Sequence, residues 1–148
     1  MLPVFFAILV SLTGKKWSST LLGIIVGLLF LYPTAGVPLS PHITVSLIVN
    51  GLVFDMYLRE SKTSLYDLSR RQLVMAGALG NLAMAVAGLL VFQIFSPAQP
   101  AYLWALALIG DTLVGAGGGF FGAIVVERVK GLQTRRVVEA TASMKVRA

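Results

Sequence analysis

Apolar residues gather in five segments along the 148-residue chain, separated by short polar stretches. The last three segments reach the ~20 residues that a membrane-spanning helix needs. The first two are shorter. The segments are Leu2–Leu12, Trp17–Tyr32, Val37–Leu58, Leu73–Phe95 and Tyr102–Val126. The pattern predicts an all-α polytopic membrane bundle with about five transmembrane segments.

Composition supports a lipid environment. Hydrophobic residues make up 57% of the chain and charged residues 12%, and the mean hydropathy is +0.86. A soluble domain usually carries about 25% charged residues. The chain has no cysteine and one histidine, His42, which excludes disulfides, thiolate sites and a histidine cluster. We therefore expect no cofactor and no metal.

The basic residues predict an orientation. All twelve lie on alternate connections: Lys15 and Lys16 after the first segment, four between Arg59 and Arg71, and six from Arg128 to Arg147. Cytoplasmic loops collect Lys and Arg. We expect a multi-pass plasma-membrane protein with its N-terminus outside, a membrane bundle over residues 1–131, and a basic cytoplasmic tail over 132–148 that forms a short surface-lying or frayed helix.

The first segment does not resemble a signal peptide, because it lacks a basic start and an Ala-x-Ala cleavage site. We expect it to be the cytoplasmic half of a helix or a stub covered by its neighbours. The formal net charge of +6 lies next to the membrane segments. It favours contact with anionic lipid rather than nucleic acid.

Small residues recur at four-residue spacing, which allows close helix packing in lipid. In the last segment, Gly118 and Gly122 form a second row of small residues beside the row of Gly115, Gly119 and Ala123. The positions predicted to serve packing or docking are Gly23, Gly27, Ala76, Gly80, Gly115, Gly119 and Ala123. The run GAGGG at 115–119 is denser than packing usually requires. A further hypothesis is that it leaves space beside the helix.

Asp111 lies about ten residues inside the last segment, roughly 15 Å deep at 1.5 Å per residue. An acid at that depth is a candidate functional residue. No basic residue is expected at the same depth, so Asp111 either contacts a ligand or hydrogen-bonds a neighbouring helix. Asp55, in contrast, is expected to reach water or to pair with Arg59 one turn later.

Few other polar groups lie inside the segments. The amides of Asn50, Asn81 and Gln93 either bridge helices or line a cavity together with Asp111. At the expected outer rim the sequence places His42, Tyr32, Tyr102 and Trp104. These residues form an interfacial aromatic belt or a lid over a pocket.

Enzyme and channel signatures are absent from the sequence. It contains no GxxxxGK[ST] phosphate loop, HExxH or GxSxG motif, no series of spaced arginines and no TVGYG run. We therefore expect a membrane binding protein and not an enzyme.

Three stretches resemble the substrate-binding S component of energy-coupling factor (ECF) transporters, a type of ABC transporter. They are "LVSLTGKKWSSTLLGIIVGLLFL", "GVPLSPHITVSLIVNGLVFDMYL" and "GDTLVGAGGGFFGAIVVERVKG". In that family a six-helix membrane protein captures a vitamin from outside and docks on a transmembrane coupling subunit with two cytoplasmic ATPases. The five segments match the family's second to sixth helices. The resemblance implies that the first helix, which carries a docking motif, is lacking.

The resemblance implies a pocket open to the outer face. It points to His42, Gln93, Tyr102, Trp104 and Asp111 as ligand-binding residues, with Asn50 as a further polar group of the interior. Asp111 would be the counter-charge or acceptor for a cationic or amine-bearing vitamin-like ligand. Two alternatives stay open: an accessory subunit of a larger membrane complex with no ligand, and a self-assembling channel or carrier with Asp111 on its axis.

Overall fold

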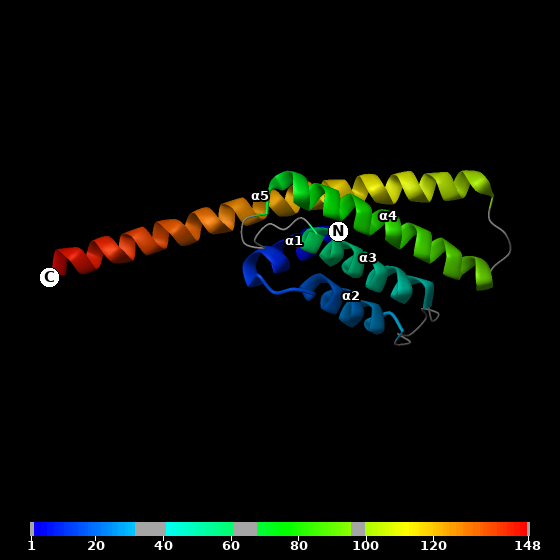
Figure 1. The fold of residues 1–148 in the computed structure, drawn as a ribbon, viewed down its shortest axis with the longest axis horizontal. Coiled ribbons are helices and arrows are strands. Elements are labelled where there is room, and N and C mark those ends of the chain that lie inside the picture. The colour runs from blue at the N-terminus through cyan, green and yellow to red at the C-terminus, as the bar shows by residue number, and fades with distance from the viewer. Residues whose placement is uncertain (1, 32–40, 61–67, 96–99, 148) are drawn as a thin grey trace.

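A computed structural model describes residues 2–31, 41–60, 68–95 and 100–147, and side chains as far as Leu132. Within these ranges the fold has five α-helices and no strand. The helices lie side by side, except that the C-terminal part of the last one projects beyond the others (Figure 1). Their bounds are α1 Leu2–Thr13, α2 Ser18–Leu29, α3 Pro41–Glu60, α4 Arg70–Phe95 and α5 Ala101–Arg147.

Helix length divides the bundle into two groups. The helical stretches Pro41–Glu60, Arg70–Ile94 and Ala101–Leu132 are long and apolar enough to cross a membrane. The helices α1 and α2 have 12 residues each, about 18 Å at 1.5 Å per residue. This is less than the ~30 Å of a bilayer's hydrocarbon core. Three of the five expected segments are thus long enough to span.

The largest difference from the expected boundaries is in α5. The sequence predicts a last segment that ends near Val126 and a separate tail over 132–148, but α5 continues without a break to Arg147. No proline interrupts residues 127–147, and Gly131 is accommodated inside the helix. Leu, Gln, Arg, Glu, Ala, Met and Lys in this stretch are all good helix formers. Residues 32–40, which include the predicted end of the second segment and the predicted start of the third, lie outside the described ranges.

The hydrophobic core lies where α1 meets α3, α4 and α5. Phe6 and Phe54 are fully buried, and their rings pack edge to face with centroids 5.5 Å apart. Around them gather Ala7, Val10, Leu58, Leu73, Ala76 and Ala123. Two of the predicted packing residues, Ala76 and Ala123, are therefore core residues.

Glycines bring α4 and α5 into backbone contact. A Cβ on Gly115 would collide with the carbonyl oxygen of Gly77, and one on Gly119 with that of Leu73. The absence of side chains at these positions lets the two backbones touch, as the spacing of Gly115 and Gly119 predicts.

The second glycine row of α5 faces α1. A Cβ on Gly118 would lie 3.1 Å from Pro3 Cβ, and one on Gly122 would lie 2.6 Å from Ala7 Cβ. The glycine-rich run is dense because α5 is packed on two sides by different helices. Gly115, Gly118 and Gly119 are buried, so the hypothesis that this run leaves open space is wrong at these three positions.

The other predicted small-residue faces also serve packing. A Cβ on Gly23 would lie 2.5 Å from the carbonyl oxygen of Leu47, and one on Gly27 would lie 3.0 Å from that of Thr44. The Thr44 hydroxyl donates a 2.8 Å hydrogen bond to the Gly27 carbonyl. These contacts hold α2 against α3. On α4, a Cβ on Gly80 would lie 2.5 Å from Asn50 Oδ1.

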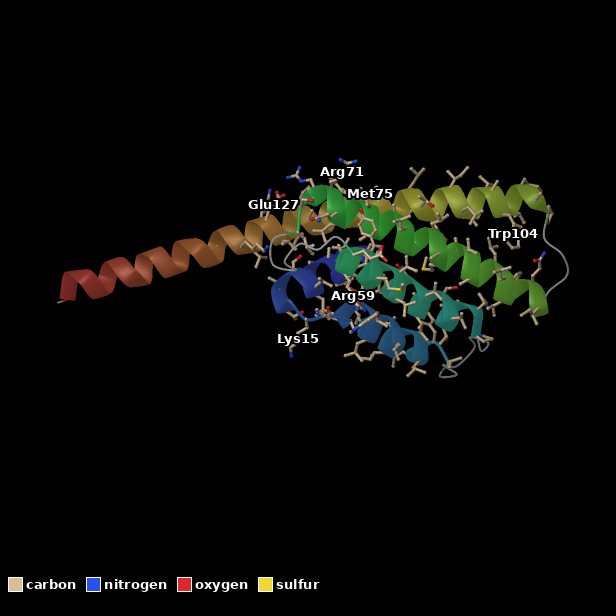
Figure 2. All side chains as sticks on the ribbon, viewed as in Figure 1. Lys15, Arg59, Arg71, Met75, Trp104 and Glu127 are labelled. Atoms are coloured by element: carbon tan, nitrogen blue, oxygen red, sulfur yellow. The ribbon has the colours of Figure 1, made fainter. Side chains whose placement is uncertain are left out.

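Charged residues gather at one end of the bundle. Figure 2 places Lys15, Arg59, Arg71 and Glu127 there, whereas Trp104 lies near the opposite end. Arg70 and Glu127 form an exposed ion pair at 2.7 Å between α4 and α5. We call this end the basic end.

Candidate functional site

A cavity of about 340 Å³ lies between α3, α4 and α5. We call it the α3–α5 cavity. Its polar groups are His42, Ser46 and Asp111, and Met84 adds a thioether. The other lining residues are Ile43, Leu47, Ala85, Gly88, Leu89, Phe92 and Ala107. An apolar hollow with a few polar groups is typical of a small-molecule site.

Asp111 is the acid of this cavity, and its carboxylate has no hydrogen-bond or ion-pair partner among the residues whose side chains are described. The neighbouring Thr112 hydroxyl donates to the Leu108 carbonyl at 2.6 Å, so it is engaged within its own helix. The expected alternative, a hydrogen bond from Asp111 to a neighbouring helix, is not found among these residues.

His42 lies on α3 and lines the cavity together with residues of α4. Its ring packs edge to face against Phe92, with centroids 5.3 Å apart and an interplanar angle of 73°. One turn later the Ser46 hydroxyl donates to the His42 carbonyl at 2.5 Å. A Cβ on Gly88 would lie 2.6 Å from Ser46 Oγ, so glycine at 88 makes room for the α3 side of the cavity.

Asn50 lies behind the cavity wall and does not line it. Its Nδ2 donates a 2.9 Å hydrogen bond to Asn81 Oδ1 and a 3.3 Å hydrogen bond to the sulfur of Met84. Both asparagines are buried, with 0% and 2% exposure. Of the two sequence-based interpretations, a bridge between helices or a cavity lining, the geometry gives the bridge. Asn50 fixes the position of Met84, which itself lines the cavity.

The other predicted ligand-binding residues do not line the cavity. Gln93 is exposed near the end of α4, and Tyr102 is 64% exposed near the start of α5. Trp104 is partly buried near that same start, two turns before Asp111. Tyr32 lies outside the described residues. The structure thus brings Asp111 and His42 together, while these side chains lie beyond the cavity lining.

Asp55 differs from the sequence-based expectation. It is buried at 8% exposure and caps the start of α2 instead of pairing with Arg59. Its carboxylate accepts hydrogen bonds from the backbone N–H groups of Ser19, at 3.4 Å, and Thr20, at 2.7 Å. The contact joins the start of α2 to the last turns of α3, the next helix in the chain. The negative carboxylate of Asp55 thereby stabilises the positive, N-terminal end of the α2 helix dipole.

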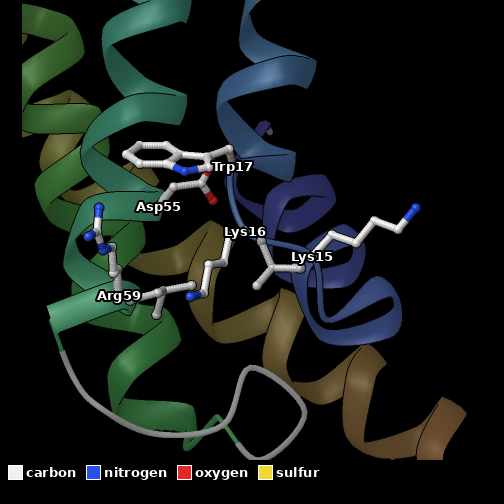
Figure 3. Close-up of a pocket in the computed structure, with 7 residues that line it drawn as sticks. Lys15, Lys16, Trp17, Asp55 and Arg59 are labelled. Atoms are coloured by element: carbon white, nitrogen blue, oxygen red, sulfur yellow. The ribbon is translucent and has the colours of Figure 1, made fainter.

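A second, smaller hollow of about 120 Å³ lies at the basic end. Figure 3 shows its five labelled residues, which come from the α1–α2 connection and from the end of α3: Lys15, Lys16, Trp17, Asp55 and Arg59. We call it the basic pocket. The two hollows lie at opposite ends of α3, since His42 is near its first residue and Arg59 near its last.

Nine of the eleven lining residues of the α3–α5 cavity were not among the predicted ligand-binding residues, and three of these nine carry a hydroxyl, a thioether or an aromatic ring. Ser46 lies one helical turn after His42 and could have been found from that spacing. Met84 and Phe92 had no such signal, because their position depends on the register between α3 and α4. No cluster of three metal-ligating side chains occurs in the described ranges.

No family model, curated protein or solved structure matches this chain. Functional inference therefore rests on the two hollows and on the chemistry of their residues.

Proposed function

We propose that this chain is the membrane-embedded substrate-binding component of a vitamin uptake transporter of the energy-coupling factor type. The observation that carries the proposal is the carboxylate of Asp111, which lines the α3–α5 cavity together with His42 and has no hydrogen-bond or ion-pair partner among the described residues. A charge placed among apolar side chains is costly without a partner. A bound cation supplies that partner.

The lining narrows the class of ligand. Asp111 accepts hydrogen bonds and carries negative charge, so the matching group is an amine, amidine or ring cation. Phe92 and the His42 ring offer flat surfaces for an aromatic ring. A small nitrogen heterocycle with a positive charge, of the thiamine or pyrimidine kind, fits both features.

The proposed topology follows from the charges. The basic end faces the cytoplasm under the positive-inside rule, and the α3–α5 cavity then opens toward the outer leaflet. Five segments take part in the bundle, with the short helices α1 and α2 packed on α5 and α3 and with apolar side chains of both exposed toward the surrounding lipid. The transmembrane coupling subunit and its two ATPases would dock from the membrane and cytoplasmic sides.

The test is a thermal-shift screen of the detergent-purified chain against water-soluble vitamins and their precursors. We expect one compound to raise the Tm of the wild type and to lose this effect in Asp111→Asn. The matched control is Glu127→Gln, which removes an exposed carboxylate from the same helix outside the cavity. It should keep the shift.

The absence of any shift, with wild type and both variants folded, would overturn the ligand-binding proposal and favour the accessory-subunit alternative. A shift that persists unchanged in Asp111→Asn would place the ligand elsewhere. A homo-oligomer with Asp111 on its symmetry axis, measured by mass in detergent, would instead favour the channel or carrier. Docking on a coupling subunit is tested separately, by co-purification of the two proteins.

A further inference from the structure

We infer that the basic pocket binds a phosphate-bearing anion, and that an anionic phospholipid headgroup is the source its lining favours. This site is distinct from the α3–α5 cavity and lies at the other end of α3. It rests on the membrane location of the bundle but not on the identity of any transported ligand.

The basic pocket carries uncompensated positive charge. Lys15, Lys16 and Arg59 line the pocket with a single acid, Asp55. Both oxygens of that carboxylate already accept hydrogen bonds from the start of α2. Among the residues whose side chains are described, none of the three cations forms an ion pair. The pocket therefore presents net positive charge around a hollow.

The turn that holds the two lysines has an unusual backbone conformation. Gly14 and Trp17, on either side of them, both have left-handed backbone angles, with φ of 59° and 66°. Left-handed φ is unfavourable for a bulky residue such as tryptophan. Asp55 accepts a hydrogen bond from the Thr20 N–H group, three residues after Trp17. Strain of this kind persists where surrounding structure enforces it, and often at binding sites.

Two of the basic side chains lie on the same side of the pocket. In Figure 3 the Lys16 side chain lies on the Arg59 side of the hollow, while that of Lys15 extends away from Asp55. The Arg59 guanidinium also stacks near the Trp17 ring, 5.9 Å from its centroid. An arginine fork and a lysine ammonium on one side of a hollow are suited to phosphate oxygens.

The apolar part of the lining favours a lipid over a soluble ion. Val10 and Leu58 line the pocket behind the charged groups. Trp17 is 42% exposed at its edge, and tryptophan is enriched at the level of lipid headgroups. A phosphodiester with glycerol and acyl groups contacts both kinds of surface, whereas inorganic phosphate contacts the cations alone.

The test compares two sources of phosphate using the full chain. In the first arm, the protein is reconstituted in nanodiscs of phosphatidylcholine with a minority of phosphatidylglycerol, and retained lipids are counted by native mass spectrometry. In the second arm, inorganic phosphate is added to delipidated protein in detergent, and the Tm is measured.

We expect the wild type to retain phosphatidylglycerol in preference to phosphatidylcholine. The double variant Lys16→Gln/Arg59→Gln should reduce this preference on the order of 25-fold, because each basic side chain that contacts the headgroup directly contributes about fivefold. The control Arg71→Gln/Arg128→Gln removes two exposed charges outside the pocket and should keep the preference. A second pocket variant, Lys15→Gln/Lys16→Gln, guards against misfolding of the first.

A Tm rise with inorganic phosphate that depends on the pocket, with lipid retention equal in all variants, would assign the site to a soluble anion. Equal lipid retention in all variants, together with no pocket-dependent phosphate effect, would overturn the proposal.

Discussion

Asp55 on α3 accepts two hydrogen bonds from Thr20 on α2, one from the backbone N–H at 2.7 Å and one from the hydroxyl at 2.8 Å. An acid near the end of one helix therefore caps the beginning of another. These hydrogen bonds join the first turn of α2 to α3 at Asp55, which also lines the basic pocket.

Replacing Asp55 by alanine should destabilise the fold. The substitution leaves the N–H groups of Ser19 and Thr20 without their acceptor in a buried setting, which costs about 1–3 kcal/mol. Thermal unfolding in detergent measures the change. The control Glu60→Gln alters an exposed acid on the same helix and should leave the Tm unchanged. An Asp55→Ala protein as stable as the wild type would contradict the capping role.

Gly119 and Gly117 provide a matched pair for the close contact of α4 and α5. A Cβ at 119 would collide with the backbone of Leu73 and Val74, whereas one at 117 meets nothing within 4 Å. We expect Gly119→Ala to destabilise the bundle by about 1–3 kcal/mol through overpacking. Gly117→Ala should stabilise it by up to about 1 kcal/mol through helix propensity. Equal effects in denaturant titrations would argue against backbone contact between α4 and α5 at Gly119.

Asn50 and Asn81 should be energetically coupled. Their buried amides bond at 2.9 Å between α3 and α4, and such bonds between membrane helices average about 0.6 kcal/mol with a maximum of about 1.7. A double-mutant cycle with Asn50→Ala and Asn81→Ala measures the coupling energy. Strictly additive losses would show that the two side chains act independently.

Asp111 should be dispensable for folding. Because its carboxylate has no described hydrogen-bond or ionic partner, Asp111→Asn removes a charge without breaking a contact. We expect a Tm equal to or above that of the wild type, while ligand binding is lost. Residues retained for function commonly reduce stability in this way. A fall in Tm as large as that of Asp55→Ala would instead indicate a structural role.

Several features of the fold follow from local patterns. Apolar segments bounded by Lys and Arg predict α3, α4 and the apolar part of α5, because helix formation in lipid depends on segment length and hydropathy. Four-residue glycine spacing predicts which faces pack. The depth of Asp111 within its apolar segment is enough to predict that this acid has an unusual environment. These signals are all contained within a single helix.

The remaining features depend on how helices are placed relative to one another. Asp55 lies within reach of Arg59 in sequence, yet it caps α2 because the tertiary fold brings the start of that helix beside it. Trp104 shares a face of α5 with Ala107 and Asp111, and Gln93 shares a face of α4 with Leu89, but both lie farther along their helices than the cavity lining reaches. The rotation and register of helices relative to one another depend on packing between separate segments. No residue spacing within one sequence reveals that packing.

The uninterrupted course of α5 has a mechanical consequence. With 47 residues it is a rod about 70 Å long, and Asp111 lies near one end while Arg147 forms the other. Long helices curve gently but do not fold back on themselves without a kink. A tilt of about 10° at the cavity end displaces the far end by about 12 Å over that length. A partner that binds only the last turns of α5 is therefore mechanically coupled to movements of this helix around Asp111.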